Sequence, residues 1–482
     1  MDPDGTASAS RRIASGTLAR LAGEAVGKVA SLAFFIVIAR ELGEELFGDF
    51  IFALSLSTVF LIVAGLGLQE LVGREIAKDR RRADELMWNV IAIRVVMLIA
   101  MLVFMTGVVV VQGRSLEIAA VILIVSLGIG FEDQAGTLYA VFNGRERQQY
   151  VAFTLIVNRV STALMGIGAA LAGASAVTIA TLFAAGSALG LATAHWLMYR
   201  FVLRPRVSIR PRAWKRLLRA SAPLAVPGIL STLLFRTSVV VLGFVAAGSA
   251  EVGEFGAAYR LIEATLFVPA AFNAAALAWF SREAEIGRGF EMAIKTVLTL
   301  TLPIGLGLAL FAQPLIEALY GAGYDGAVTP LRLLGAMAAL WGVNTTVVTV
   351  LVSRGRTGVY TLPALLALAP NAVLALVLIP AYGADGAAIA ALAGAAVLLA
   401  LALPRTARLV GAGGFVRVLP APLAAGAAMA LCAAALSGLP WIPAAIGSVA
   451  AYAAAFLAIE RVFSPGDFAF YSSVARPRVA RR

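Results

Sequence analysis

The sequence predicts an all-α polytopic membrane protein with about fourteen transmembrane helices. Of its 482 residues, 61% are hydrophobic and 14% are charged, whereas a soluble domain carries about 25% charged residues. The mean hydropathy is +0.90. Apolar runs of 20 or more residues recur from Leu18 to Phe463, and each is long enough to cross the hydrocarbon core as a helix.

The first six predicted spans are separated by loops whose charge alternates. They cover residues 18–40, 48–71, 87–111, 116–141, 151–173 and 176–199. The loops after the second, fourth and sixth spans are basic and include Arg74, Arg145 and Arg200. The loops after the first, third and fifth spans hold a single basic residue, Arg114, and acids such as Glu41.

Eight more spans follow a basic stretch at 200–219. They cover residues 220–246, 254–280, 291–318, 329–352, 359–380, 385–404, 418–437 and 441–463. Arginines again follow every second span, among them Arg282, Arg354 and Arg405. Lysine and arginine concentrate on the cytoplasmic side of membrane proteins. We therefore expect a plasma-membrane protein with both termini in the cytoplasm.

The composition excludes several function classes. Cys432 and His195 are the single residues of their types, so the sequence predicts no disulfide within the chain, no metal site and no cofactor. There is no phosphate-binding glycine loop and no catalytic motif, and we expect no enzyme. The pI of 10.3 is consistent with nucleic-acid binding, but basic loops on one side fit topology and anionic lipid headgroups better. We predict membrane lipids as partners and no nucleic acid.

The chain shows an internal repeat. Gly48-Asp49-Phe50 opens the second span, and Gly253-Glu254-Phe255 opens the eighth. Both copies enter the membrane in the same sense, six spans apart. This arrangement predicts two lobes that are related by an axis along the membrane normal, with a substrate site between them.

Longer stretches carry a family resemblance. "LYGAGYDGA" is followed by "LRLL", then by "SRGRTGVY", and then by Asn371 ahead of "LIPAYGADGAAIA". In the first half, "IARELGEELFGDFIFALSLSTVFLIVAGLGLQELVGREIA" is similar to a first helix pair, and "GEFGAAYRLIE" to the eighth helix. In this order, the segments resemble the polysaccharide (O-antigen type) flippases of the multidrug/oligosaccharidyl-lipid/polysaccharide exporter superfamily.

The resemblance implies two six-helix lobes that form a V around a central cavity, here with two C-terminal helices added. The expected divisions are 1–203 for the N-terminal lobe, 204–219 for a basic linker, 220–405 for the C-terminal lobe, 406–463 for helices 13 and 14, and 464–482 for a cytoplasmic tail. It also implies alternating access, which carries an oligosaccharide linked to a polyprenyl phosphate or diphosphate to the outer face. Coupling to H⁺ or Na⁺ is expected, and glycan polymerase or ligase machinery is a possible partner.

Two alternatives lie in the same superfamily, namely a lipid II flippase and a multidrug/cation antiporter. Lipid II flippases typically carry basic residues in their second helix, and the span 48–71 has none. Fourteen spans and basic mid-span residues favour an anionic lipid-linked sugar over a drug. The family's seventh helix often carries an acid two residues after its basic residue, where this chain has Ser238.

Arg236 is the first candidate site residue, because it lies midway along the seventh span. A charge at that depth costs roughly 3 kcal/mol unless it faces a partner or a wet cavity. Pro223 and Pro227 precede it and predict a kinked helix. Arginine presents a planar fork of donors that suits a phosphate. The alternative is an arginine that pairs with a carboxylate and serves only to hold helices together.

The first span supplies further candidates. Arg20, Glu24 and Lys28 recur every four residues and share one helical face. They either line the cavity or form a charge ladder that reaches the interface, and Lys28, the deepest, favours the cavity.

Other charges within the spans complete the predicted set. Arg94, Arg159 and Arg260 are further candidates for substrate binding, although Arg94 and Arg159 lie close enough to the interface to reach it. The candidates for ion coupling are Glu132, Asp133 and Glu263. Glu132 and Asp133 are adjacent and cannot both face one direction, and either is expected to line the cavity or to pair with Arg94 or Arg159. Arg260 and Glu263, three residues apart, are expected to pair.

Overall fold

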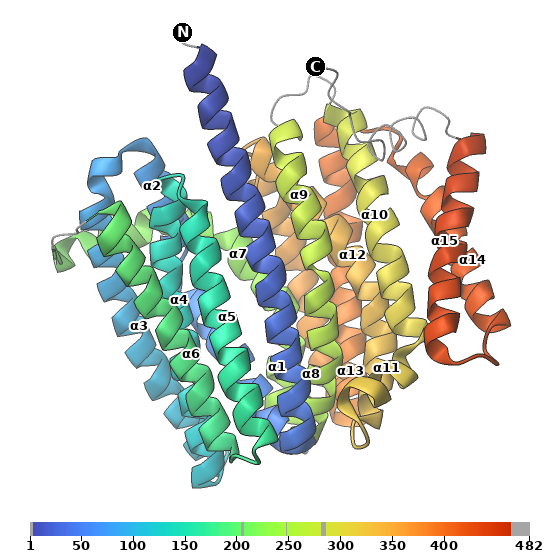
Figure 1. Cartoon of the computed structure of the whole chain (residues 1–482), viewed down its shortest axis with the longest axis horizontal. Coiled ribbons are helices and arrows are strands. Elements are labelled where there is room, and N and C mark those ends of the chain that lie inside the picture. The colour runs from blue at the N-terminus through green and yellow to red at the C-terminus, as the bar shows by residue number, and fades with distance from the viewer. Residues whose placement is uncertain (1–2, 204–206, 247, 281–285, 464–482) are drawn as a thin grey trace.

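The computed structural model describes residues 3–203, 207–246, 248–280 and 286–463, and within these ranges it contains helices and no strands (Figure 1). The predicted all-α class is therefore confirmed. The expected tail at 464–482, residues 204–206 of the expected linker, and Arg282 lie outside the described residues.

The N-terminal lobe contains six α-helices. They are α1 (Pro3–Gly65), α2 (Leu68–Lys78), α3 (Ala83–Val111), α4 (Leu116–Gly144), α5 (Gln148–Leu171) and α6 (Ala176–Leu197). A 3₁₀ turn, η1 (Arg80–Arg82), precedes α3, and a π-helical turn, η2 (Met198–Val202), follows α6. Gly43 has φ 73° and bends α1 into two consecutive helices, a conformation that glycine adopts without steric penalty.

The rest of the chain forms nine α-helices within the described residues. They are α7 (Pro211–Val245), α8 (Ser249–Thr265), α9 (Phe267–Phe280), α10 (Ile286–Leu310), α11 (Ala312–Tyr320), α12 (Val328–Ser353), α13 (Gly358–Val410), α14 (Pro420–Ala435) and α15 (Trp441–Phe463). Short 3₁₀ turns, η3 (Asp325–Ala327) and η4 (Phe415–Val418), precede α12 and α14. Gly383, with φ 49°, divides α13 as Gly43 divides α1.

The number of spans agrees with the prediction. In the part of the chain that the structure describes, eleven helices are long and apolar enough to cross a membrane. Two of these, α1 and α13, are each a pair of spans joined at a glycine bend. The 29-residue helix α4 adds one more, which gives fourteen. The eighth predicted span is interrupted at Leu266, between α8 and α9.

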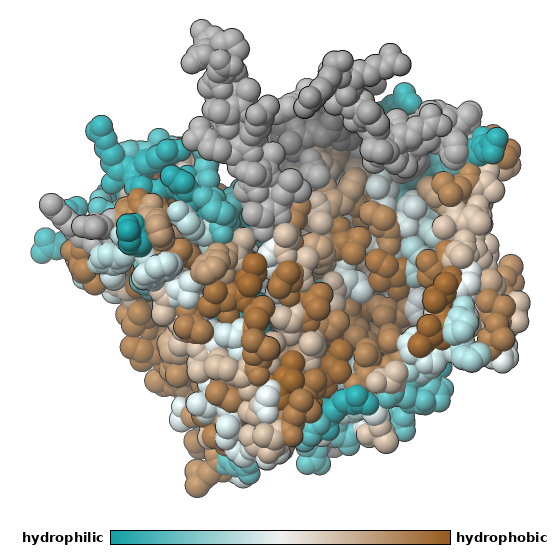
Figure 2. All heavy atoms as spheres, in the orientation of Figure 1, coloured by the Kyte–Doolittle hydropathy of each residue, from teal (hydrophilic) through white to brown (hydrophobic). Residues whose placement is uncertain are grey.

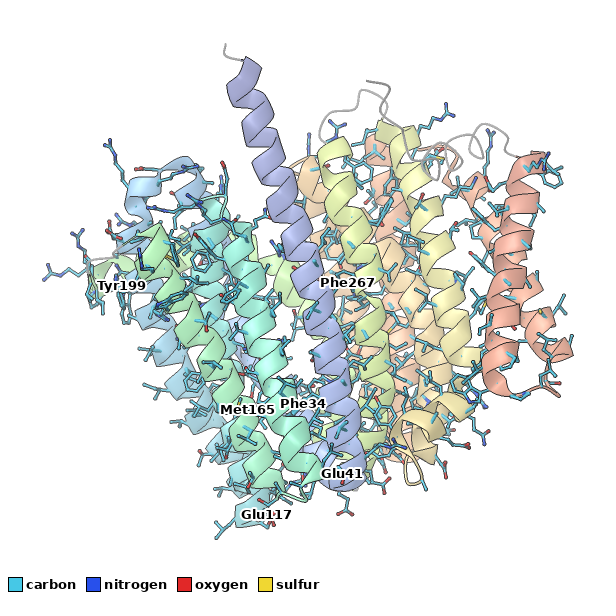
Figure 3. All side chains as sticks on the ribbon, viewed as in Figure 1. Phe34, Glu41, Glu117, Met165, Tyr199 and Phe267 are labelled. Carbon is cyan, nitrogen blue, oxygen red and sulfur yellow. The ribbon has the colours of Figure 1, made fainter. Side chains whose placement is uncertain are left out.

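The surface has the pattern of a membrane protein. On the face shown in Figure 2, a broad apolar band crosses the bundle, with hydrophilic residues toward both ends. α1 begins and α15 ends at the same end of the bundle (Figure 1), which we call the terminal end. Glu41 and Glu117 lie at the opposite, distal end (Figure 3). α14 and α15 stand at one outer edge and pack mainly on α10.

The two lobes meet at the distal end through the two copies of the repeat. A Cβ atom on Gly48 would overlap the backbone carbonyl of Ser249, and one on Gly253 would overlap that of Glu44. Each glycine thus accommodates the backbone four residues before the other. Beside them, the hydroxyl of Ser249 donates to the Asp49 carboxylate at 2.7 Å. The lobes are therefore closed against each other at this end.

The segment that joins the lobes is fixed to the N-terminal lobe by one buried residue of α3. The Asn89 side chain, 0% exposed, donates to the carbonyl of Ser208 at 3.0 Å. It accepts from the backbone N–H of Arg210 at 2.7 Å and from the Trp214 indole at 3.2 Å. α7 begins at Pro211, nine residues before the predicted span, so much of the expected linker is an ordered helix.

α7 takes part in two separate hydrophobic cores. Near its start, Leu217 is buried among residues of α2 to α6, and Trp214 packs against the same cluster. Beyond Pro223 and Pro227, the buried residues Leu230, Leu234, Val239 and Leu242 belong to the other core, where α7 packs along α13. The prolines therefore lie where the helix leaves the cluster of α2 to α6 and begins to pack along α13.

Candidate functional site

A cavity of about 390 Å³ lies between the lobes, near the middle of α1. Its charged lining residues are four basic and three acidic side chains: Lys28, Arg159, Arg236 and Arg260, and Glu24, Glu132 and Glu263. The wall is completed by polar and apolar residues that include Ser31, Thr58, Phe35 and Phe183. Both lobes contribute to it, and α1 of the N-terminal lobe packs against α5 of the same lobe and α8 of the other.

On the N-terminal side, α4 and α5 supply one ion pair. Both terminal nitrogens of Arg159 donate to the Glu132 carboxylate, at 2.9 and 2.8 Å. The Ser187 hydroxyl of α6 donates to the same carboxylate at 3.3 Å. This bidentate geometry is the strongest that an arginine and a carboxylate form. The pair holds three helices of one lobe together while it faces the cavity.

On the C-terminal side, a single carboxylate holds two arginines. Glu263 of α8 accepts from Arg236 of α7 at 2.5 Å through Oε1, and from Arg260 of α8 at 2.5 Å through Oε2. The Arg260 guanidinium lies 4.0 Å from the centre of the Phe35 ring of α1. Its Nε and Nη2 atoms are buried and donate to no group that the structure describes. Buried donors without acceptors are rare, so Arg260 retains hydrogen-bonding capacity.

Lys28 differs from these arginines because it forms no ion pair with any described residue. It is exposed in the cavity and also lines a small recess of about 40 Å³ beside Arg260 and Glu263. One turn earlier, Glu24 is occupied by Arg20 at 2.9 Å. Lys28 is therefore a positive charge in the wall of the central cavity that no described carboxylate approaches within ion-pair distance.

A second cavity of about 290 Å³ continues from the first toward the junction of α1 and α2, at the terminal end. The two cavities share Thr58, Ile129 and Glu132 in their linings. In the second cavity Arg94, 4% exposed, lies 3.4 Å from Asp133 and donates to the Asp133 backbone carbonyl. The second cavity is more acidic, because Glu70 and Asp133 also line it.

Outside the spans, one carboxylate fixes the corner between α2 and α3. Glu75 pairs with Lys78 at 3.1 Å and with Arg82 at 2.5 Å. The hydrogen bond from Lys78 is the main cause of the lowered pKa of Glu75. The corner therefore stays ionised and bonded at neutral pH.

The structure brings most of the candidate residues to one place. Nine of the ten line the two connected cavities, and Arg20 reaches them only through Glu24. The possibility that Arg94 reaches the interface is wrong, because its partner Asp133 holds it in a buried position. Glu132 and Asp133 pair with different arginines, as their adjacency requires. No cluster of metal-ligating side chains occurs among the described residues.

Sequence reasoning did not find several buried polar groups. Lys295 of α10 and Glu460 of α15 form an ion pair at 2.7 Å and are 2% and 0% exposed. They lie 165 residues apart in the chain, and nothing in the local pattern of either helix indicates the other. Asn89 likewise gave no signal, because asparagine is common in loops and at helix ends. Glu70, which lines the second cavity, could have been found from the sequence, because it is an acid at the end of a predicted span.

Comparisons with known proteins agree with this architecture. Residues 13–282 match the family described as polysaccharide biosynthesis protein. The structure is similar to that of a lipid II flippase MurJ in an inward closed conformation, with a TM-score of 0.74 and 16% identity over 93% of this chain and 98% of that chain. It is also similar to an inward-facing multidrug resistance MATE family transporter, with a TM-score of 0.64 and 16% identity over 82% of this chain and 98% of that one.

A third similar structure is a transporter of the MOP (multidrug/oligosaccharidyl-lipid/polysaccharide) superfamily from Pyrococcus furiosus. Its TM-score is 0.57, with 16% identity over 83% of this chain and 96% of that chain. Comparison with curated proteins gave no match. At these identities the structural likeness shows the fold alone, and that fold is one of multi-pass membrane transporters.

Proposed function

The chain belongs to the polysaccharide biosynthesis protein family within the multidrug/oligosaccharidyl-lipid/polysaccharide superfamily, and on this premise we propose that it is a flippase for a lipid-linked oligosaccharide. The cargo is a sugar chain on a polyprenyl phosphate or diphosphate. It passes from the cytoplasmic to the outer face of the plasma membrane as the lobes open to each side in turn. Both termini face the cytoplasm, and the protein is no enzyme.

The observation that carries the proposal is the charge of the cavity. Lys28 has no ion-pair partner among the described residues, and three arginines surround it. A phosphate or diphosphate headgroup is the part of such a cargo that cannot enter hydrocarbon, and a wet cationic cavity is where it can cross. Guanidinium groups recognise phosphate oxygens through paired hydrogen bonds. The closed distal end and the second cavity toward the terminal end are consistent with loading from the cytoplasm.

Ion coupling is part of the proposal. Glu132, Asp133 and Glu263 are the carboxylates proposed to take H⁺ or Na⁺, and each is paired with an arginine. Dissipating the proton gradient and the sodium gradient separately, while the sidedness of the cargo is measured, identifies the coupling ion. Glycan polymerase or ligase machinery on the outer face would receive the cargo.

The test uses cells that lack this gene and carry plasmids for the wild type, Arg236→Ala or Arg408→Ala. Arg408 is exposed in the last turn of α13, away from the cavity, and serves as the control. We expect cytoplasmic-face lipid-linked oligosaccharide to accumulate in the deletion strain. The wild type and Arg408→Ala should remove it, and Arg236→Ala should not. The absence of accumulation in the deletion strain would overturn the proposal.

A lipid II flippase is the second candidate, favoured by the extent of the fold match to MurJ. It predicts rescue of cells depleted of their own lipid II flippase. A multidrug antiporter is less consistent with a cavity in which basic side chains outnumber acidic ones. It would confer drug resistance on overexpression and would be indifferent to the loss of glycan synthesis.

A further inference from the structure

The bridge between Glu263, Arg236 and Arg260 raises a question about release. A carrier must bind its cargo and also let it go, so its site cannot hold a diphosphate too tightly. A dianion among Lys28 and three unpaired arginines in a cavity with reduced access to water would be held very firmly. The structure shows that the arginines are not unpaired. Their partners are carboxylates built into the same walls.

We propose that Glu263 is an internal competitor of the substrate phosphate, which occupies Arg236 and Arg260 in the empty carrier, yields them to the cargo, and reclaims them to expel it. This inference rests on the proposed function and names the residue that sets the affinity of its site. It differs from a purely structural role, in which Glu263 would only hold α7 and α8 together.

The geometry supports an exchange. Each oxygen of Glu263 serves one arginine, at 2.5 Å in both cases, so the carboxylate occupies the position that a phosphate with two acceptor oxygens would take. The three side chains are only 10 to 14% exposed, yet all three line the cavity. Lys28 lines the same cavity and the small recess beside Glu263. A headgroup that first contacts Lys28 is therefore placed next to the bridge.

The hydrogen-bond donors of Arg260 that have no acceptor also support an exchange. Its Nε and Nη2 atoms are buried and donate to no described group, although a guanidinium offers five N–H donors. Glu263 alone cannot satisfy both arginines, because each receives only one of its oxygens. A diphosphate carries more acceptor oxygens than a carboxylate and can satisfy donors that Glu263 leaves free. This difference lets the cargo displace an acid that is already in place.

The experiment measures binding of geranylgeranyl diphosphate to the full chain in nanodiscs of uncharged phosphatidylcholine. Geranylgeraniol, which has the same tail without the phosphates, separates headgroup binding from tail binding. The variants are Glu263→Gln, which keeps the shape and removes the charge, and Glu263→Asp, whose shorter side chain cannot reach both arginines at once. Glu117→Gln removes a negative charge from an exposed side chain at the distal end that lines neither cavity, and it controls for net charge.

We expect Glu263→Gln to bind the diphosphate roughly tenfold more tightly than the wild type, since a charged hydrogen bond contributes about that factor. Glu263→Asp should lie between them, and Glu117→Gln should change the affinity by less than about twofold because its charge is more distant. In cells, Glu263→Gln should transport more slowly despite its tighter binding. That opposition between affinity and transport is not expected of a structural residue.

Weaker or unchanged binding by Glu263→Gln, with a normal melting temperature, would overturn the inference and leave the proposed function in place. Weaker binding by Glu263→Asp would overturn it as well, and this variant retains the charge if the glutamine does not fold. Equal binding of geranylgeranyl diphosphate and geranylgeraniol by the wild type would count against the proposed function itself, and the inference would fall with it.

Discussion

Gly48 of α1 and Gly253 of α8 face each other as reciprocal halves of one contact. Each lies against the backbone carbonyl four residues before the other, at Ser249 and at Glu44. Since both are the first residue of the repeated Gly-acid-Phe motif, the repeat is the surface through which the two lobes close at the distal end. Close approach of two helix backbones requires glycine at both positions.

A valine at Gly48 or at Gly253 should therefore separate the lobes at the distal end. We expect at least a tenfold loss of transport, because backbone cannot move aside as a side chain can. Cysteine labelling at Asp49→Cys from the outer face should become faster. Gly107→Val is the matched control, since that helical glycine has no neighbouring atom within 4 Å of a built Cβ. Normal transport by Gly253→Val would show that closure at this end does not depend on the contact.

Two substitutions of Lys28 should show whether its positive charge contributes to the affinity of the central cavity for a diphosphate. Lys28→Gln removes the one unpaired cation among the described lining residues, and we expect binding of geranylgeranyl diphosphate to weaken by roughly tenfold. Lys28→Arg keeps the charge and should retain most of the affinity. Isothermal titration calorimetry in nanodiscs measures both. A glutamine variant with wild-type affinity would remove Lys28 from the binding site.

The effects of replacing Lys295 and Glu460 on the stability of the protein should be strongly interdependent. Lys295→Met alone leaves a 0% exposed carboxylate without its partner, which costs about 3–5 kcal/mol in comparable buried pairs. The double variant Lys295→Met/Glu460→Met should recover most of the loss, because apolar side chains then fill the same space. The melting temperatures of the wild type, the single variants and the double variant, measured by thermal unfolding in detergent, test this expectation. Equal melting temperatures for the single and double variants would argue against coupling.

Asn89→Ala should release the joining segment from the N-terminal lobe. The substitution removes the acceptor of the Trp214 indole and of the Arg210 backbone N–H, and an unsatisfied buried group costs about 1–3 kcal/mol. We expect trypsin to cleave after Arg212 several times faster than in the wild type, as followed by gel densitometry. Asn143→Ala is a suitable comparison, since the Asn143 side-chain oxygen has no hydrogen-bond partner in the described structure. Equal cleavage rates in Asn89→Ala and the wild type would show that another contact holds the segment.

The membrane spans could be predicted from the sequence because burial in lipid imposes a simple rule on composition. Length and hydropathy are properties of each segment alone, so spans such as α3 and α12 lie where they were expected. The bends at Gly43 and Gly383 join spans that were predicted separately. The start of α7 could not be predicted, because residues 211–219 are rich in basic residues, a composition that is typical of a loop. Their position depends on a contact of the preceding residue, Arg210, with Asn89 of α3, which no local pattern indicates.

The site was predictable as a set of charges and not as a set of pairs. A charge within a span must find a partner, so the residues themselves could be selected. Spacing of three residues indicated the pairing of Arg260 with Glu263, and the structure confirms it. The second partner of Glu263, Arg236, comes from a different helix, and no local pattern indicates a contact between helices. Whether these residues bind the cargo stays a prediction.

The packing of α7 in two cores also constrains the order in which the protein can fold during its synthesis. The cluster that binds α2 to α6 together includes Leu217, with Trp214 packed against it, and both residues come after the joining segment in the chain. Domains usually fold in turn as they leave the ribosome. Here the first lobe still lacks part of its core when its sixth helix has entered the membrane. It can be completed only when the next helix emerges, so a nascent chain that pauses just before Trp214 would present an open apolar face to chaperones and proteases.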